Sequence, residues 1–71
     1  MLTRLNASAL RIESQTIILT MLHARRMEAV AMGDDRQVEA MTREVEVQTQ
    51  QVAALERQYT ALVLALARVE N

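Results

Sequence analysis

The sequence predicts an all-α fold, an antiparallel hairpin of two long helices, and three observations lead to this prediction. The 71-residue chain has no Pro and one Gly, so it offers a single natural place for a helix to end. The other residues are mostly strong helix formers such as Ala, Leu, Met, Glu, Gln and Arg. Apolar residues recur every three or four positions on both sides of the glycine. We therefore expect one domain over residues 1–71, with helices over about 3–32 and 35–69.

The first helix has the less regular apolar pattern. Alternating steps of three and four residues pass through nine positions, six of which are apolar. These positions are Leu2, Leu5, Ala9, Ile12, Thr16, Leu19, His23, Arg26 and Val30. We expect this line to face the second helix, with Leu5, Ile12, Leu19 and Val30 in the hairpin core.

Residues 33–35 predict a very tight turn. Gly33 suits the left-handed backbone conformation that follows a helix end. Asp34 can accept a hydrogen bond from the first free amides of the next helix, with Gln37 as its reciprocal partner. Asp35 adds negative charge at the positive end of the second helix dipole.

The second helix has a sustained coiled-coil pattern. Nine of its ten seam positions are apolar, and Gln48 is the polar exception. The expected core residues are Val38, Met41, Val45, Val52, Leu55, Tyr59, Leu62 and Leu66, and Val69 ends the line. Gln48 either fixes the register of the pair or reaches solvent with its long amide. An antiparallel pair of these lines predicts a hairpin of about 45 Å, at ~1.5 Å per residue.

Many apolar residues lie outside this seam. A two-helix hairpin buries one side of each helix, whereas 51% of the chain is apolar. We expect the surplus to be covered by a second copy, which would give a four-helix bundle, or by a different protein. The predicted partner-binding residues are Leu10, Ile17, Ile18, Met21, Leu22 and Leu64.

The residues that carry chemistry do not form a catalytic or metal-binding pattern. There is no Cys, and His23 is the single histidine. We interpret His23 as a partly buried seam residue that bonds Gln48, Thr16 or the partner. Asp34 and Asp35 are better explained as helix caps than as cation ligands. The sequence therefore predicts a protein that is not an enzyme and has no cofactor.

Charge and hydropathy restrict the partners. Eight Arg and nine acidic residues give a net charge of −1, so we expect neither nucleic acid nor an anionic membrane as partner. The apolar runs are far shorter than the ~20 residues that cross a bilayer. The first residues lack the continuous apolar run of a signal peptide, and we expect a cytoplasmic protein.

Three segments resemble a known family. The start MLTRL, the stretch IILTMLHARR (17–26) and the turn GDDRQVEAMTRE (33–44) are similar to the small needle-subunit co-chaperones of type III secretion systems. The two longer segments cover under a third of the chain. The resemblance implies a cytoplasmic, non-enzymatic hairpin. It also implies binding to a larger helical-repeat chaperone, so that the needle subunit stays unpolymerised before export.

The residues leave two alternatives open beside this function. The first is a homodimeric four-helix bundle whose arginines bind RNA or another regulator. The second is a small immunity-type inhibitor that folds as a hairpin dimer and blocks a toxin.

Overall fold

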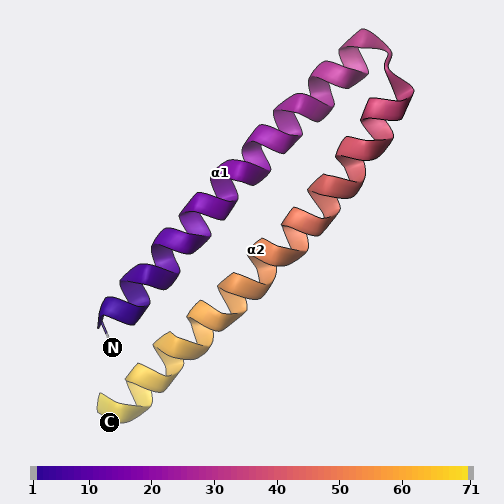
Figure 1. The fold of residues 1–71 in the computed structure, drawn as a ribbon. Coiled ribbons are helices and arrows are strands. Elements are labelled where there is room, and N and C mark those ends of the chain that lie inside the picture. The colour runs from indigo at the N-terminus through magenta and orange to yellow at the C-terminus, as the bar shows by residue number, and fades with distance from the viewer. Residues whose placement is uncertain (1, 71) are drawn as a thin grey trace.

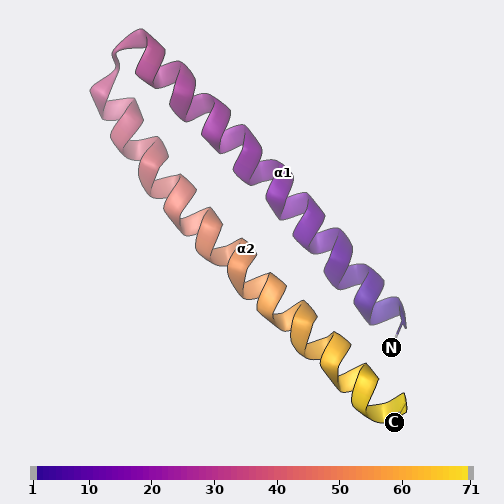
Figure 2. The same cartoon turned by 180° about the vertical axis from the view of Figure 1, so that it is seen from behind.

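Two long helices account for almost the whole chain. The computed structural model describes the backbone of residues 2–70 and the side chains of residues 3–69. Helix α1 spans Leu2–Met32 and helix α2 spans Asp35–Glu70. They run antiparallel, with both termini at one end and the turn at the other (Figures 1 and 2). The predicted all-α hairpin is confirmed, and each helix is one residue longer than expected.

A glycine in the left-handed conformation ends α1. Gly33 has a φ of 70°, where a side chain would be strained. Its N–H donates to the Val30 carbonyl over 3.1 Å, and the Asp34 N–H donates to the Ala29 carbonyl over 3.1 Å. These two bonds satisfy carbonyls that the helix end leaves free. The chain can therefore reverse within two residues.

Asp34 caps the N-terminus of α2, as predicted. Its Oδ1 accepts a hydrogen bond from the Gln37 backbone N–H over 3.2 Å. Its carbonyl accepts the first helical bond of α2, from the Val38 N–H over 3.0 Å. The predicted reciprocal bond, in which the Asp34 N–H donates to the Gln37 side-chain oxygen, does not form, because that N–H donates to the Ala29 carbonyl.

The predicted seam of α2 is confirmed along the length that α1 covers. Met41 and Val52 are buried, and so is Gln48. The other core positions are half-buried, namely Val38, Val45, Leu55, Tyr59, Leu62 and Leu66. Val69 is 75% exposed, because α2 has 36 residues against 31 in α1 and extends past it.

The seam of α1 differs from the prediction at every second position. Leu5, Ile12, Leu19 and Arg26 are half-buried as expected. The positions between them were assigned to the wrong side, since Ala9, Thr16, His23 and Val30 are all exposed. Their places are taken by the preceding residues, which are Ser8, Gln15, Leu22 and Ala29. Val30 is 54% exposed and Ala29 only 5%.

This error has a simple reason: the predicted set of positions (9, 16, 23 and 30) and the observed set (8, 15, 22 and 29) are almost equally apolar. The prediction chose Ala and Val with Thr and His, whereas the structure buries Leu and Ala with Ser and Gln. Which set faces inward depends on the residues of α2 opposite it, because Gln48 of α2 bonds Gln15 across the seam. Thr16 instead bonds the Ile12 carbonyl of its own helix over 2.8 Å. Leu22, predicted to be part of the partner-binding surface, therefore faces α2.

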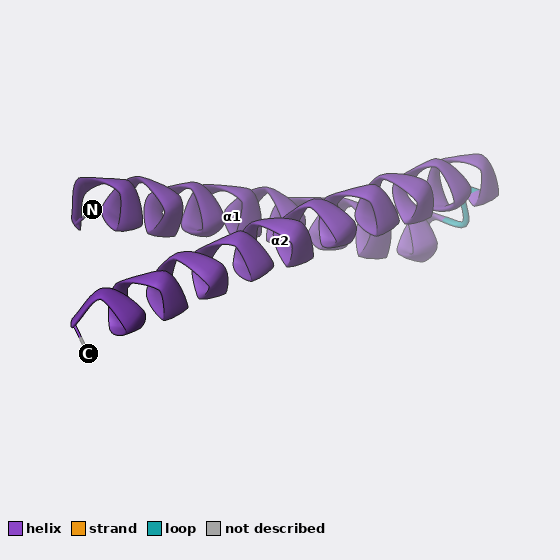
Figure 3. Cartoon of the chain, turned by 90° about the horizontal axis from the view of Figure 1, so that it is seen from below, coloured by secondary structure: helices purple, strands orange, loops and turns teal. Residues whose placement is uncertain are grey.

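The hairpin is a thin rod, with extents of 56 × 15 × 11 Å. It is longer than the expected 45 Å, because the estimate followed the shorter helix and the longer α2 sets the length. In the view of Figure 3 the ribbons of α1 and α2 overlap toward the turn and diverge toward the termini. Each helix therefore has a neighbour on one side only. The side chain of Leu2, predicted to lie in the seam, is outside the described residues.

Candidate interaction surface

An amide pair, with Gln48 buried and Gln15 half-buried, joins the two helices near the middle of the seam. The Gln48 Nε2 donates to the Gln15 side-chain Oε1 over 2.7 Å and to the Gln15 carbonyl over 3.0 Å. Gln48 is 8% exposed, so the interpretation that its amide reaches solvent is wrong. A buried amide without a partner is costly, so these bonds favour one alignment of α1 against α2.

A second polar contact joins the helices closer to the turn. The Arg26 Nε donates to the Thr42 hydroxyl over 2.8 Å, and that hydroxyl donates to the Val38 carbonyl over 2.8 Å. Arg26 thus occupies an inward position with its polar end bonded. His23 was expected to be partly buried here, but it is exposed, because Leu22 takes the inward place.

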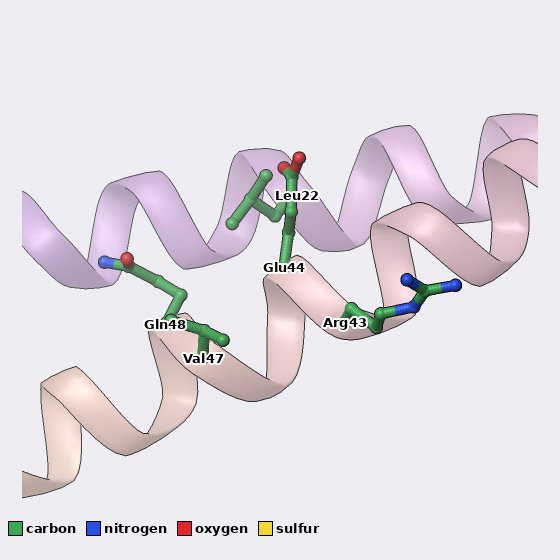
Figure 4. Close-up of a pocket in the computed structure, with 5 residues that line it drawn as sticks. All are labelled: Leu22, Arg43, Glu44, Val47 and Gln48. Carbon is green, nitrogen blue, oxygen red and sulfur yellow. The ribbon is translucent and has the colours of Figure 1, made fainter.

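The hollows of the surface are shallow and open. One of about 320 Å³ lies between Leu22 of α1 and four residues of α2, which are Arg43, Glu44, Val47 and Gln48. Figure 4 shows the Arg43 guanidinium pointing away from Leu22. Within residues 3–69, no three His, Cys, Asp or Glu side chains gather as metal ligands would. The same residues contain one ion pair, between the exposed Arg43 and Glu39 over 3.5 Å.

The six predicted partner-binding residues do not form one surface. Leu10 and Ile17 are 64% and 57% exposed, and each lies two positions from the inward residues on either side of it. Two positions correspond to about 200° of helix, so both side chains lie on the side of α1 opposite to α2. Leu64 lies two positions from Leu62 and Leu66 and is on the far side of α2. Leu64 and Ile17 are therefore on opposite edges of the rod.

What the structure assembles is a continuous line along α1. It contains the exposed Leu10, Ile17 and Met21, and it repeats every three or four residues. We call it the outer stripe, and its residues are Thr3, Ala7, Leu10, Ser14, Ile17, Met21 and Ala24. None of them is charged, and together they extend over about 32 Å at ~1.5 Å per residue. Ile18 borders the stripe and is 41% exposed.

The pattern of the outer stripe is the signal that points to this surface. A mainly apolar line with a 3.5-residue period is typical of the side that a helix presents to another helix, and five of the seven stripe residues are apolar. Alpha1 thus has two such lines, one facing α2 and one facing outward. The sequence shows both lines, but their assignment to inside and outside depends on the position of α2.

Comparison with models of protein families, with curated proteins and with solved structures gives no significant match for this chain. Over the residues that the structure describes, neither helix has a stretch that is both long and apolar enough to span a membrane.

Proposed function

We propose that this protein is a non-enzymatic binding subunit that docks on a larger helical protein through the outer stripe of α1. The observation that carries the proposal is the exposure of this uncharged stripe in a hairpin that has no second layer. Large apolar side chains on one line of a small protein are typical of a protein-binding surface. The thin rod also lacks an enclosed cavity that could hold a substrate among its described residues.

The partner in this proposal is a helical-repeat chaperone of a type III secretion system, and the complex keeps a needle subunit unpolymerised in the cytoplasm. The support for this identity is the resemblance of residues 17–26 and 33–44 to the small co-chaperones. The first of these segments contains Ile17, Met21 and Ala24 of the outer stripe. The family resemblance and the exposed surface therefore coincide on α1.

Co-expression tests this function. The full chain is produced with a type III secretion chaperone and its needle subunit, and the complex is purified through a tag on the chaperone. We expect the three proteins to co-purify and the light scattering of the needle subunit to stay low. Polymerisation at the same rate with and without this chain would overturn the co-chaperone assignment.

A pair of matched variants tests the surface. Ile17→Asp with Met21→Asp places two charges on the outer stripe and should abolish co-purification. Gln50→Asp with Thr60→Asp places the same charges at exposed positions of α2 and should leave it unchanged. Equal loss in both variants would show that the outer stripe is not the docking surface.

Sedimentation of the chain alone distinguishes the homodimeric alternatives from the co-chaperone proposal. The outer stripe has the period that a second copy could also use, so a dimer is their expected result. A stable dimer that Ile17→Asp with Met21→Asp converts to monomer would replace the co-chaperone proposal with a four-helix bundle.

A further inference from the structure

A row of arginines follows one edge of the outer stripe. Four positions spaced seven residues apart each follow a residue of the stripe directly. Three of them are arginines, Arg4, Arg11 and Arg25, and the fourth is Ile18. Positions with this spacing lie on one line of the helix, about 10 Å apart. All three arginines are exposed. We call Arg4, Arg11 and Arg25 the arginine row.

The other edge of the stripe has a different character. It carries Asn6, Glu13, Thr20 and Met27, of which one is charged. The outer stripe therefore has one basic edge and one nearly neutral edge. A helix that covers the stripe brings its own flanking residues against these edges, so the difference between them can select the partner.

The hairpin itself leaves the arginine row without carboxylate partners. The one ion pair among residues 3–69 is Arg43 with Glu39, so no member of the row is paired there. The polar side chains of α2 that share hollows with the row are amides. Arg4 shares a hollow with Gln58, Arg11 with Gln51, and Arg25 with Gln37. Glu28 and Asp34 also border the hollow at Arg25, without an ion pair to it.

We propose that the helix docking on the outer stripe carries Asp or Glu at every seventh position, on the edge that meets the arginine row. This inference rests on the proposed function, because it assumes that the stripe is the docking surface. Arginine guanidinium groups bind carboxylates in a bidentate manner, and pairs at the rim of an interface determine the orientation and choice of partner.

A second copy of this chain does not supply these carboxylates through its own outer stripe. If two α1 helices pair antiparallel, the same edge of each meets, so arginine row faces arginine row. If they pair parallel and in register, Arg11 faces Asn6 and Arg25 faces Thr20 of the other copy, and Glu13 faces Ile18. Neither arrangement places a glutamate against an arginine. The charges therefore favour an acidic helix of a different protein.

Three synthetic peptides test this inference against the full chain. Each is a labelled amphipathic helix of four heptads with Leu and Ala on its apolar side and with Glu, Gln or Lys at the flanking positions. Binding is measured by fluorescence anisotropy at low ionic strength, where charge pairs are least screened. We expect the Glu peptide to bind about tenfold more tightly than the Gln peptide, and the Lys peptide more weakly still.

The chain offers a matched control for the charge reversal. The outer side of α2 also carries three arginines at multiples of seven residues, with one position of the row missing. They are Arg36, Arg43 and Arg57. Changing all three residues of the arginine row to Glu should reverse the preference between the Glu and Lys peptides. Changing the three α2 arginines to Glu alters the net charge equally and should keep the original preference. Equal effects of both triple variants would overturn the inference, because net charge would explain the binding.

The outcomes separate this inference from the proposed function. If all three peptides bind equally and Ile17→Asp with Met21→Asp abolishes their binding, the stripe docks helices and the acidic-edge inference alone is wrong. If the peptides bind but this double variant has no effect, the stripe is not the docking surface and the proposed function fails. Absence of binding by every peptide would overturn both.

Discussion

The two helices of this hairpin have similar lengths but distribute their apolar residues differently around the helix. Alpha2 places most of its large apolar residues on one line that faces α1, whereas Val47, Val63 and Leu64 lie off this line and are exposed. Alpha1 divides its apolar residues between two lines, with Leu5, Ile12 and Leu19 inward and Leu10 and Ile17 outward. The main apolar line of helix α2 is therefore the one that packs in the hairpin. Helix α1 has a second apolar line that is exposed, and its inner line includes the polar residues Ser8, Gln15 and Arg26.

The arginines of the two helices differ in the same way. Those on the outer side of α2 lie beside acidic residues, as Arg43 lies beside Glu39. Those of the arginine row lie beside the uncharged outer stripe. The same spacing of arginines thus lies among acidic residues on α2 and along the edge of the proposed docking surface on α1.

The largest expected effect contrasts the inner line of α2 with the outer line of α1. Val52→Asp places an unpaired charge in the seam and should cost about 3 kcal/mol of unfolding free energy. A hairpin this small has about 3–5 kcal/mol to lose, so the variant should be largely unfolded at 25 °C. Ile17→Asp, at an exposed position, should change the unfolding free energy by less than about 0.5 kcal/mol. Circular dichroism during urea titration measures both, and equal losses would mean that α1 has no free side.

We expect an intermediate effect at the amide pair of Gln15 and Gln48, which joins the two helices. Gln48→Ala removes two hydrogen bonds and leaves a gap, and should cost about 1–2 kcal/mol. A double-mutant cycle with Gln15→Ala should give a coupling energy of about 1 kcal/mol, because the two amides bond each other. Gln51→Ala, at an exposed neighbouring position, is the control. A coupling energy of zero would place Gln15 away from α2 and revive the first assignment of the α1 seam.

The smallest effect is expected at the turn, which belongs equally to both helices. Gly33→Ala should cost about 1 kcal/mol, because an alanine resists the left-handed conformation. Apart from the residues adjoining Gly33, no atom of the described chain lies within 4 Å of the added Cβ, so the cost comes from the backbone alone. Gly33→Asn should cost less, since Asn tolerates this conformation better. Thermal unfolding followed by circular dichroism distinguishes the two variants.

Much of the fold was predictable because local rules agree with one another. A single Gly followed by Asp, between two helical stretches, is sufficient to place the turn within a residue. The seam of α2 was predictable for the same reason, since nine apolar residues in ten leave no competing line. The exposure of Leu10, Ile17, Ile18, Met21 and Leu64 was also predictable, because they lie off the seam.

The candidate surface was predictable only in part. Leu22 was placed outside and Val30 inside, because a helix with two apolar lines gives no internal reason to prefer one phase. The grouping of Leu64 with the α1 residues was also wrong, since position along the rod says nothing about which edge a side chain occupies. Both errors concern rotation about a helix axis.

Residue order alone was sufficient for the number of helices, their ends, the cap at Asp34 and the inner line of α2, because these depend on neighbours within about four residues. The rotation of α1, the bonding of Gln15 to Gln48 and the outward position of the stripe depended on packing. These features involve residues from both helices, and the residue pattern of one helix does not determine the position of the other helix.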